Sequence, residues 1–141
     1  MYRITFVLDL FKGAKDRELS HASLKTLLMA LMHIDILYLK EHPEVPALIG
    51  PGGMGPAGVR YAEEPPGQED WQDIPTTLKL GWGDCEDLAC WRAAELRVRH
   101  NVQAEPTFIW KLRPNGGYLY HILVRYPDGR IEDPSRTLGM R

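Results

Sequence analysis

The sequence predicts an α+β fold, in which a helical N-terminal half is followed by an antiparallel β meander. Apolar residues recur at helical spacing over residues 15–41, above a polar opposite face. Three strand-like runs, at residues 107–112, 118–126 and 130–133, are separated by turn residues. The chain has 141 residues, of which 44% are hydrophobic and 26% are charged, enough for one good core and too few for two. Residues 1–141 are therefore expected to form a single domain.

The N-terminal half is expected to contain a strand, a long helix and a loop. In residues 1–10, Asp9 ends the apolar run too early for a signal peptide. We expect this segment to be a strand instead. The helix over residues 15–41 supplies much of the core, and His42-Pro43 ends it, since the residue before a proline avoids helical angles. Residues 44–67 are rich in proline and glycine, which predicts a long flexible surface loop. Such a loop is either a functional flap or a disordered insertion.

Two further helices are expected before the strands. Residues 71–80 suggest a short helix that Gly81 closes. The next helix is expected over residues 85–99, with Asp84 as its N-cap. Cys85 therefore lies in the first turn of a helix, where a thiolate is stabilised.

The turn between the last two strands predicts which side chains share a face. Pro127-Asp128-Gly129 places proline and glycine where a three-residue hairpin loop with a bulge requires them. In that register Leu123 lies opposite Asp133, and His121 is the diagonal neighbour of Asp133 on the same face. A two-residue turn would put Asp133 on the other face of the sheet. The turn chemistry therefore favours a His121–Asp133 pair.

These residues suggest a catalytic triad for acyl transfer through a thiol. Cys85 is the expected nucleophile, His121 the base that takes its proton, and Asp133 the group that orients the imidazole. The backbone N–H of Cys85 is expected to help stabilise the oxyanion, because first-turn amides lack partners within the helix. A second donor or substrate contact is open among three side chains, Gln72, Trp82 and Tyr120.

Three carboxylates surround the cysteine in the sequence. Asp84, Glu86 and Asp87 would raise the pKa of a thiol by like-charge repulsion. One interpretation is that Asp84 caps the helix while the other two complement its dipole. The other is a calcium site, because clustered oxygen ligands suit that ion. The triad itself requires no cofactor.

The charge pattern and the cysteines limit the classes of partner and compartment. The net charge is −2, with acidic and basic residues mixed along the chain, so nothing marks a nucleic-acid or anionic membrane partner. No apolar run approaches the roughly 20 residues that a membrane span needs. Cys85 and Cys90 point to different faces of one helix and are expected to be free thiols. We expect a cytoplasmic protein whose partner is a protein or peptide substrate.

Three segments together resemble the transglutaminase-like cysteine peptidases of bacteria and their phages: Gly83-Asp84-Cys85-Glu86-Asp87-Leu88-Ala89, His121-Ile122-Leu123-Val124 and Asp133-Pro134-Ser135. The resemblance covers residues 71–135. It implies a papain-like core, in which a helix bearing the nucleophile packs on an antiparallel sheet bearing the histidine and aspartate. It also implies that the family's triad falls on Cys85, His121 and Asp133, and that calcium dependence is a property of some relatives. A phage origin would place the protein in the virion or the host cytoplasm.

Several functions share this chemistry. We expect a cysteine peptidase or amidohydrolase acting on peptide or glutaminyl amide bonds, because hydrolysis needs no second substrate site. The alternatives are a deamidating or crosslinking transglutaminase and a non-catalytic module of a larger assembly such as a phage particle. Zinc binding is disfavoured because four residues lack a recognised ligand spacing, Cys85, Cys90, His100 and His121.

Overall fold

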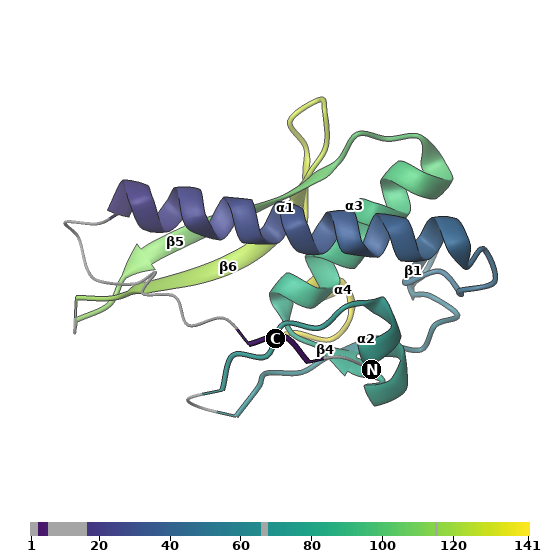
Figure 1. Cartoon of the computed structure of the whole chain (residues 1–141), viewed down its shortest axis with the longest axis horizontal. Helices are drawn as coiled ribbons and strands as arrows, with labels where there is room; N and C mark the ends of the chain where they lie inside the picture. Colours follow the sequence, from purple (N-terminus) through teal and green to yellow (C-terminus); the bar gives the residue numbers. More distant parts are fainter. Residues whose placement is uncertain (1–2, 6–16, 66–67, 115) are drawn as a thin grey trace.

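The predicted α+β class is confirmed by a computed structural model of the chain, which describes residues 3–5, 17–65, 68–114 and 116–141 (Figure 1). Helices dominate the first part of the chain, and an antiparallel sheet follows. The elements are α1 (Arg17–Glu41), β1 (Ile49–Gly50), β2 (Gly53–Met54), β3 (Arg60–Tyr61), α2 (Ile74–Leu80), β4 (Trp82–Gly83), α3 (Cys85–His100), β5 (Glu105–Leu112), β6 (Tyr118–Arg125), β7 (Ile131–Glu132) and α4 (Pro134–Thr137).

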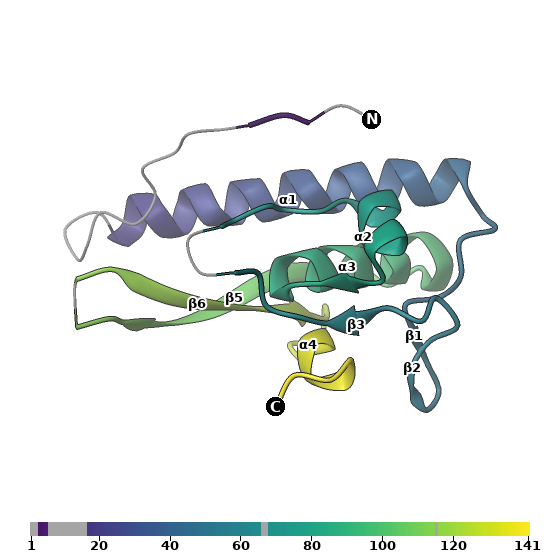
Figure 2. The ribbon, with the colours of Figure 1, turned by 90° about the horizontal axis from the view of Figure 1, so that it is seen from below.

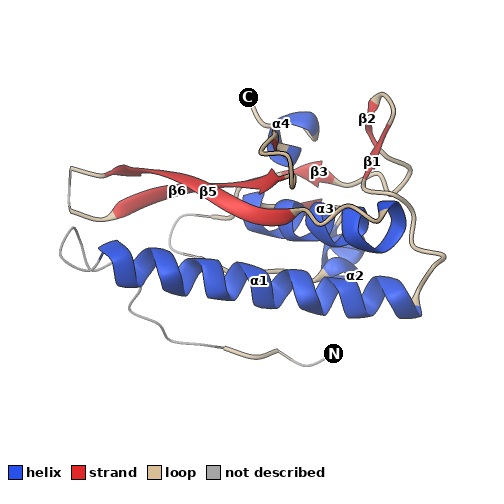
Figure 3. Ribbon diagram, turned by 90° about the horizontal axis from the view of Figure 1, so that it is seen from above, coloured by secondary structure: helices blue, strands red, loops and turns tan. Residues whose placement is uncertain are grey.

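The core lies between the helices and the main sheet. Helix α1 runs along one side of the β5–β6 hairpin, while α4 lies on the other side (Figures 2 and 3). Helix α3 packs against both α1 and β6. Large buried apolar side chains of this cluster come from these elements, from α2 and from the segment between α1 and α2: Leu28, Met32, Leu39, Leu48, Val59, Ile74, Leu88, Trp91 and Val124. The site described below forms where α3 begins against β6.

Helix α1 confirms the predicted long helix over its described residues, and residues 15–16 lie outside them. By length and composition alone α1 could cross a membrane, contrary to the expectation that no segment would. The core helix of a soluble protein passes the same test, and Leu28 and Met32 of α1 are fully buried. The predicted N-terminal strand is wrong for residues 3–5, which lie outside helices and strands, and its other residues lie outside the described part.

The segment expected to be a flexible loop is instead packed against the core. Leu48 and Val59 are fully buried, and the N–H of Gly55 donates to the carbonyl of Leu48 at 2.9 Å. A Cβ atom at Gly55 would lie 2.3 Å from the carbonyl oxygen of Ala47, so only glycine fits. Strand β3 pairs in parallel with β4, just before the cysteine helix. The disordered insertion is therefore wrong for the described part of residues 44–67, because composition alone overlooked the apolar residues that anchor this segment. The role as a functional flap stays a prediction.

The helix that carries the cysteine begins at its predicted N-cap, whereas the helix expected over residues 71–80 begins three residues later, at Ile74, and is closed by Gly81 as predicted. The side chain of Asp73 accepts the N–H of Thr76 at the start of α2, and Gly81 closes α2 with a φ of 78°. Asp84 caps α3, and Asp87 completes a capping box by accepting the N–H of Asp84 at 2.9 Å. Helix α3 therefore starts at Cys85, as predicted.

The sheet has the strand order β5-β6-β7 and is antiparallel throughout. The N–H of Tyr126 donates to the carbonyl of Arg130 at 2.8 Å, and Gly129 has a φ of 92°. This is the predicted three-residue loop with its glycine in the left-handed region. Several strand boundaries differ by one or two residues from the prediction. The difference that matters for the site is that β7 ends at Glu132, and Asp133 is the N-cap of α4 rather than the last strand residue.

Candidate active site

The predicted contact between His121 and Asp133 is confirmed. Nε2 of His121 lies 2.8 Å from Oδ2 of Asp133, and both side chains are about four-fifths buried. The other carboxylate oxygen, Oδ1, accepts the backbone N–H of Arg136 at 3.2 Å. Helix α4 thus fixes Asp133, and Asp133 fixes the imidazole ring. Because Nε2 faces the carboxylate, Nδ1 is the nitrogen that can exchange a proton with a reactant.

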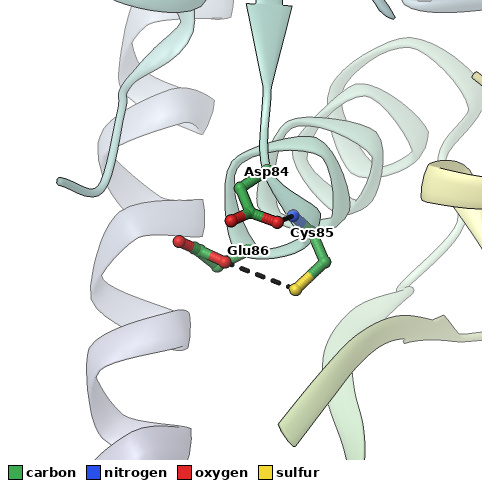
Figure 4. Close-up of side chains that lie close together, drawn as sticks. All are labelled: Asp84, Cys85 and Glu86. Carbon is green, nitrogen blue, oxygen red and sulfur yellow. Dashed lines mark hydrogen bonds between the residues drawn. The ribbon is translucent and has the colours of Figure 1, made fainter. Parts of the chain in front are cut away.

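Cys85 is the first residue of α3 and is partly buried. Its Sγ lies 3.4 Å from Oε2 of Glu86, and its backbone N–H donates to Oδ1 of Asp84 at 2.6 Å (Figure 4). The expectation that this N–H is free to stabilise an oxyanion is therefore wrong in this conformation. The reason is local, since the capping side chain immediately before the cysteine takes the amide.

The thiol also faces the edge of β6. In a strand, alternate N–H groups point to the same side, so the N–H of Ile122 points the same way as that of Tyr126, which pairs with the strand segment beyond the turn. At Ile122 that neighbouring strand has already ended. The N–H of Ile122 contacts the Cys85 thiol instead and lowers its pKa.

The three predicted triad residues are therefore linked to the middle of β6: the thiol of Cys85 lies beside Ile122, His121 is the preceding residue, and Asp133 contacts His121. Within the part of the chain that the structure describes, the hydrogen bond of the thiol goes to Glu86 rather than to His121.

The environment of Cys85 keeps it protonated at neutral pH. Burial raises the pKa of the thiol strongly, and the negative charge of Glu86 raises it further. Asp84 acts in the same direction, while the N–H of Ile122 opposes it. The predicted effect of the neighbouring carboxylates on the thiol pKa is thus confirmed in direction, with burial as the larger cause.

The carboxylates near the cysteine differ in what holds them. Asp87 accepts two backbone N–H groups, from Gln72 at 2.7 Å and from Asp84 at 2.9 Å. Burial nevertheless raises the pKa of Asp87 to about 8. Glu86 is 5% exposed, and its Oε1 has no partner among the described residues. Burial, followed by the charges of Asp87 and Asp84, raises the pKa of Glu86 well above its usual range.

A fourth carboxylate joins the group from a distant part of the chain. Oxygen atoms of Glu64, Glu86 and Asp87 all lie within 4.8 Å of one another. Oε1 of Glu64 is buried without a partner among the described residues, and burial raises the pKa of Glu64. The sequence offers no signal for this neighbour, because only the pairing of β3 with β4 brings its segment to the start of α3.

The three residues expected to bind substrate lie in different places. Gln72 is 5% exposed, and its Oε1 accepts the hydroxyl of Thr77 at 3.2 Å. Trp82 is partly buried in β4. Tyr120 lies on the face of β6 opposite to His121, where its ring packs against His21 at a centroid distance of 5.4 Å. The structure does not bring Tyr120 to the thiol.

No family model, curated protein or solved structure matches this chain. The functional argument rests on the geometry of the site.

Proposed function

We propose that the protein is a thiol acyl-transfer enzyme, a cysteine peptidase or amidohydrolase with a papain- and transglutaminase-like core. Cys85, His121 and Asp133 form its triad. The observation that supports this most strongly is the 2.8 Å contact between His121 and Asp133 at the edge of β6 that also meets the Cys85 thiol. The carboxylate on Nε2 of His121 leaves Nδ1 as the nitrogen available to a thiol.

The reaction follows from the position of each group. His121 takes the proton of the Cys85 thiol as the sulfur attacks the carbonyl carbon of the substrate amide. The imidazolium, which Asp133 stabilises, then protonates the departing amine, and a thioester remains on Cys85. Water, activated by His121, hydrolyses this thioester to the carboxylic acid and restores the thiol. Because burial and Glu86 raise the pKa of the resting thiol, His121 acts as a base during attack rather than storing a thiolate–imidazolium pair.

The products of one assay distinguish this enzyme from its alternatives. A peptide library is incubated with the wild-type chain, Cys85→Ala and the control Cys90→Ala, and covalent thioesters are detected by mass spectrometry. The peptidase is supported if the wild type and Cys90→Ala form a thioester, Cys85→Ala forms none, and the product released is the free carboxylic acid. Transfer to an added amine would point to crosslinking instead. A chain that forms no thioester at all is the non-catalytic module.

We further propose that the acidic cluster holds a divalent cation, for which calcium is the suitable choice. Glu86 and Glu64 each offer a buried carboxylate oxygen without a partner among the described residues, and Asp84 lies beside Glu86. Asp87 is a weaker candidate because two backbone N–H groups occupy its oxygens. The bound cation would supply positive charge next to carboxylates that raise the pKa of the thiol.

Removal of calcium tests this part of the proposal. The melting temperature is measured with millimolar calcium and with chelator, on the wild type and on Glu64→Gln. We expect calcium to raise the melting temperature of the wild type and to have a smaller effect on Glu64→Gln. Equal melting temperatures and equal turnover with calcium and with chelator would show that no calcium binds here.

We also propose a cytoplasmic location, in the producing cell or, for a phage protein, in its host. Both cysteines are free, which suits a reducing compartment. Fractionation of a tagged chain between membrane and soluble extract tests this, because α1 has the length and composition of a membrane span.

A further inference from the structure

The two faces of the β5–β6 hairpin have different surroundings. On one face, rings from both strands surround His21 of α1, at centroid distances from 5.0 to 5.6 Å. The other face carries His121 and points away from α1. Two large apolar side chains on that face are exposed, Ile109 at 59% and Leu119 at 40%.

Both apolar side chains adjoin the proposed general base. Ile109 lies directly opposite His121 in the ladder between β5 and β6. Leu119 precedes His121 by two residues on the same strand and so shares its face. Cross-strand neighbours have Cβ atoms about 4.5 to 5.5 Å apart. We call Ile109, Leu119 and His121 together the outer patch.

The position of the outer patch indicates its occupant. A substrate that presents its carbonyl to Cys85 must lie beside His121, since this residue must reach the departing amine. An extended peptide projects alternate side chains to one side, and those on the side of His121 meet Ile109 and Leu119. Contact with an apolar side chain would bury both residues and exclude water from the imidazole.

We propose that the outer patch binds an apolar side chain of an extended peptide substrate, close to the scissile bond, and that Ile109 and Leu119 set this preference. This inference rests on the proposed function. It defines the substrate class as peptides with a leucine-like or phenylalanine-like residue near the cleaved amide.

Peptide binding to the inactive full-length chain tests the inference without requiring turnover. Fluorescein-labelled hexapeptide pools, each with leucine, phenylalanine, serine or aspartate fixed at one position, are titrated with Cys85→Ala and followed by anisotropy. We expect the leucine and phenylalanine pools to bind about tenfold more tightly than the other two, the scale of discrimination of an apolar pocket. Adding Ile109→Thr and Leu119→Thr should remove this preference.

A matched control separates the outer patch from apolar surface in general. Leu37 of α1 is 65% exposed, and Leu37→Thr in the Cys85→Ala chain should leave the preference unchanged. Threonine keeps the strand propensity of the two exposed positions, and the pool comparison needs no patch variant at all. Equal binding of apolar and polar pools, or an undiminished preference in the double variant, would overturn the inference even if Cys85 cleaves peptides. A clear apolar preference in a chain whose wild type forms no thioester would show that the outer patch binds apolar side chains but would refute the enzyme and, with it, the role of the patch in substrate choice.

Discussion

Glu86 has two opposing relations to Cys85 at the residue scale. Its Oε2 accepts the hydrogen bond of the thiol at 3.4 Å, and its charge raises the pKa of that thiol. The carboxylate itself is almost fully buried with one oxygen unpartnered among the described residues. Glu86, where it is ionised, thus adds to the effect of burial in keeping the Cys85 thiol protonated.

Glu86→Gln should increase the reactivity of Cys85. Where Glu86 is ionised, removing its charge lowers the pKa of the thiol, and each unit by which that pKa falls raises the thiolate fraction about tenfold. The gain should therefore grow as the pH rises through the raised pKa of Glu86 and be small below it. The measurement is the rate of iodoacetamide alkylation at Cys85, by mass spectrometry across pH. Cys90, which is fully buried, serves as an internal control that should stay unmodified. An unchanged Cys85 rate would contradict the assigned effect of Glu86.

The same carboxylate predicts how stability depends on pH. The pKa of Glu86 is raised above its ordinary value of 4.5 in the folded chain, so the folded state binds this proton more tightly than the unfolded state. The contribution of Glu86 to the free energy of unfolding is full below pH 4.5, the ordinary pKa of the group, and is lost as pH rises toward the pKa in the folded chain. Asp87, with a pKa raised to about 8, acts with the same sign.

We therefore expect the free energy of unfolding of the wild type to fall between about pH 5 and about pH 8, and that of Glu86→Gln to fall less. Urea denaturation in calcium-free buffer at several pH values measures both. The contradicting result is a free energy of unfolding that rises with pH over this range, and rises more steeply in the wild type than in Glu86→Gln. Glu86 would then be ionised in the folded chain.

Turn chemistry made the central contact predictable, whereas the acidic cluster needed the structure. The Pro127-Asp128-Gly129 sequence favours the register that brings His121 to Asp133 over that of a two-residue turn. Nothing local in the sequence relates Glu64 to Glu86, because their proximity depends on the parallel pairing of β3 and β4. The hydrogen bond from the N–H of Cys85 to the side chain of Asp84 was likewise unpredictable. An N-cap side chain can instead accept only an N–H further along the first turn of the helix.

The β6–β7 turn is the element that positions Asp133. Its loop depends on Gly129, whose φ of 92° disfavours any other residue. A shift of register by one residue would move Asp133 to the other face of the sheet. The catalytic proposal therefore depends on a glycine outside the site.

Gly129→Ala should destabilise the chain by about 1–2 kcal/mol and reduce the turnover of peptides. Gly52→Ala is the matched control, because a Cβ atom there meets open space and its φ lies outside the left-handed region. Urea denaturation and initial rates measure both variants. Equal stability of the two variants would mean that the turn tolerates alanine and that the predicted loop does not constrain Asp133.

The segment between α1 and α2 shows where composition misleads. Proline and glycine were interpreted as signs of a mobile loop, yet Leu48 and Val59 are fully buried and Gly55 is required by a close backbone approach. Glycine serves tight packing as well as flexibility. The choice between these two roles depends on tertiary contacts that the local sequence does not contain.

For the whole molecule, helical periodicity and strand runs were sufficient to predict a helical half and a meander. They were not sufficient for the small β3–β4 pair, which joins residues far apart in the chain, or for the position of α4. Both elements surround the start of α3 and complete the site. The fold class was thus predictable from local patterns, while the environment of the thiol depended on long-range packing.

The most direct test of the triad is the rate at which an electrophilic peptide probe modifies Cys85 in the wild type, His121→Ala and Asp133→Asn. General-base catalysis is worth about 10²- to 10⁴-fold, so the account predicts a loss of at least about 10²-fold in His121→Ala and a smaller loss in Asp133→Asn. The unfolding midpoints of the three chains should differ by no more than is expected for replacing a side chain that is about four-fifths buried. Equal rates of modification in the wild type and His121→Ala would contradict the account, because Cys85 would then react without its base.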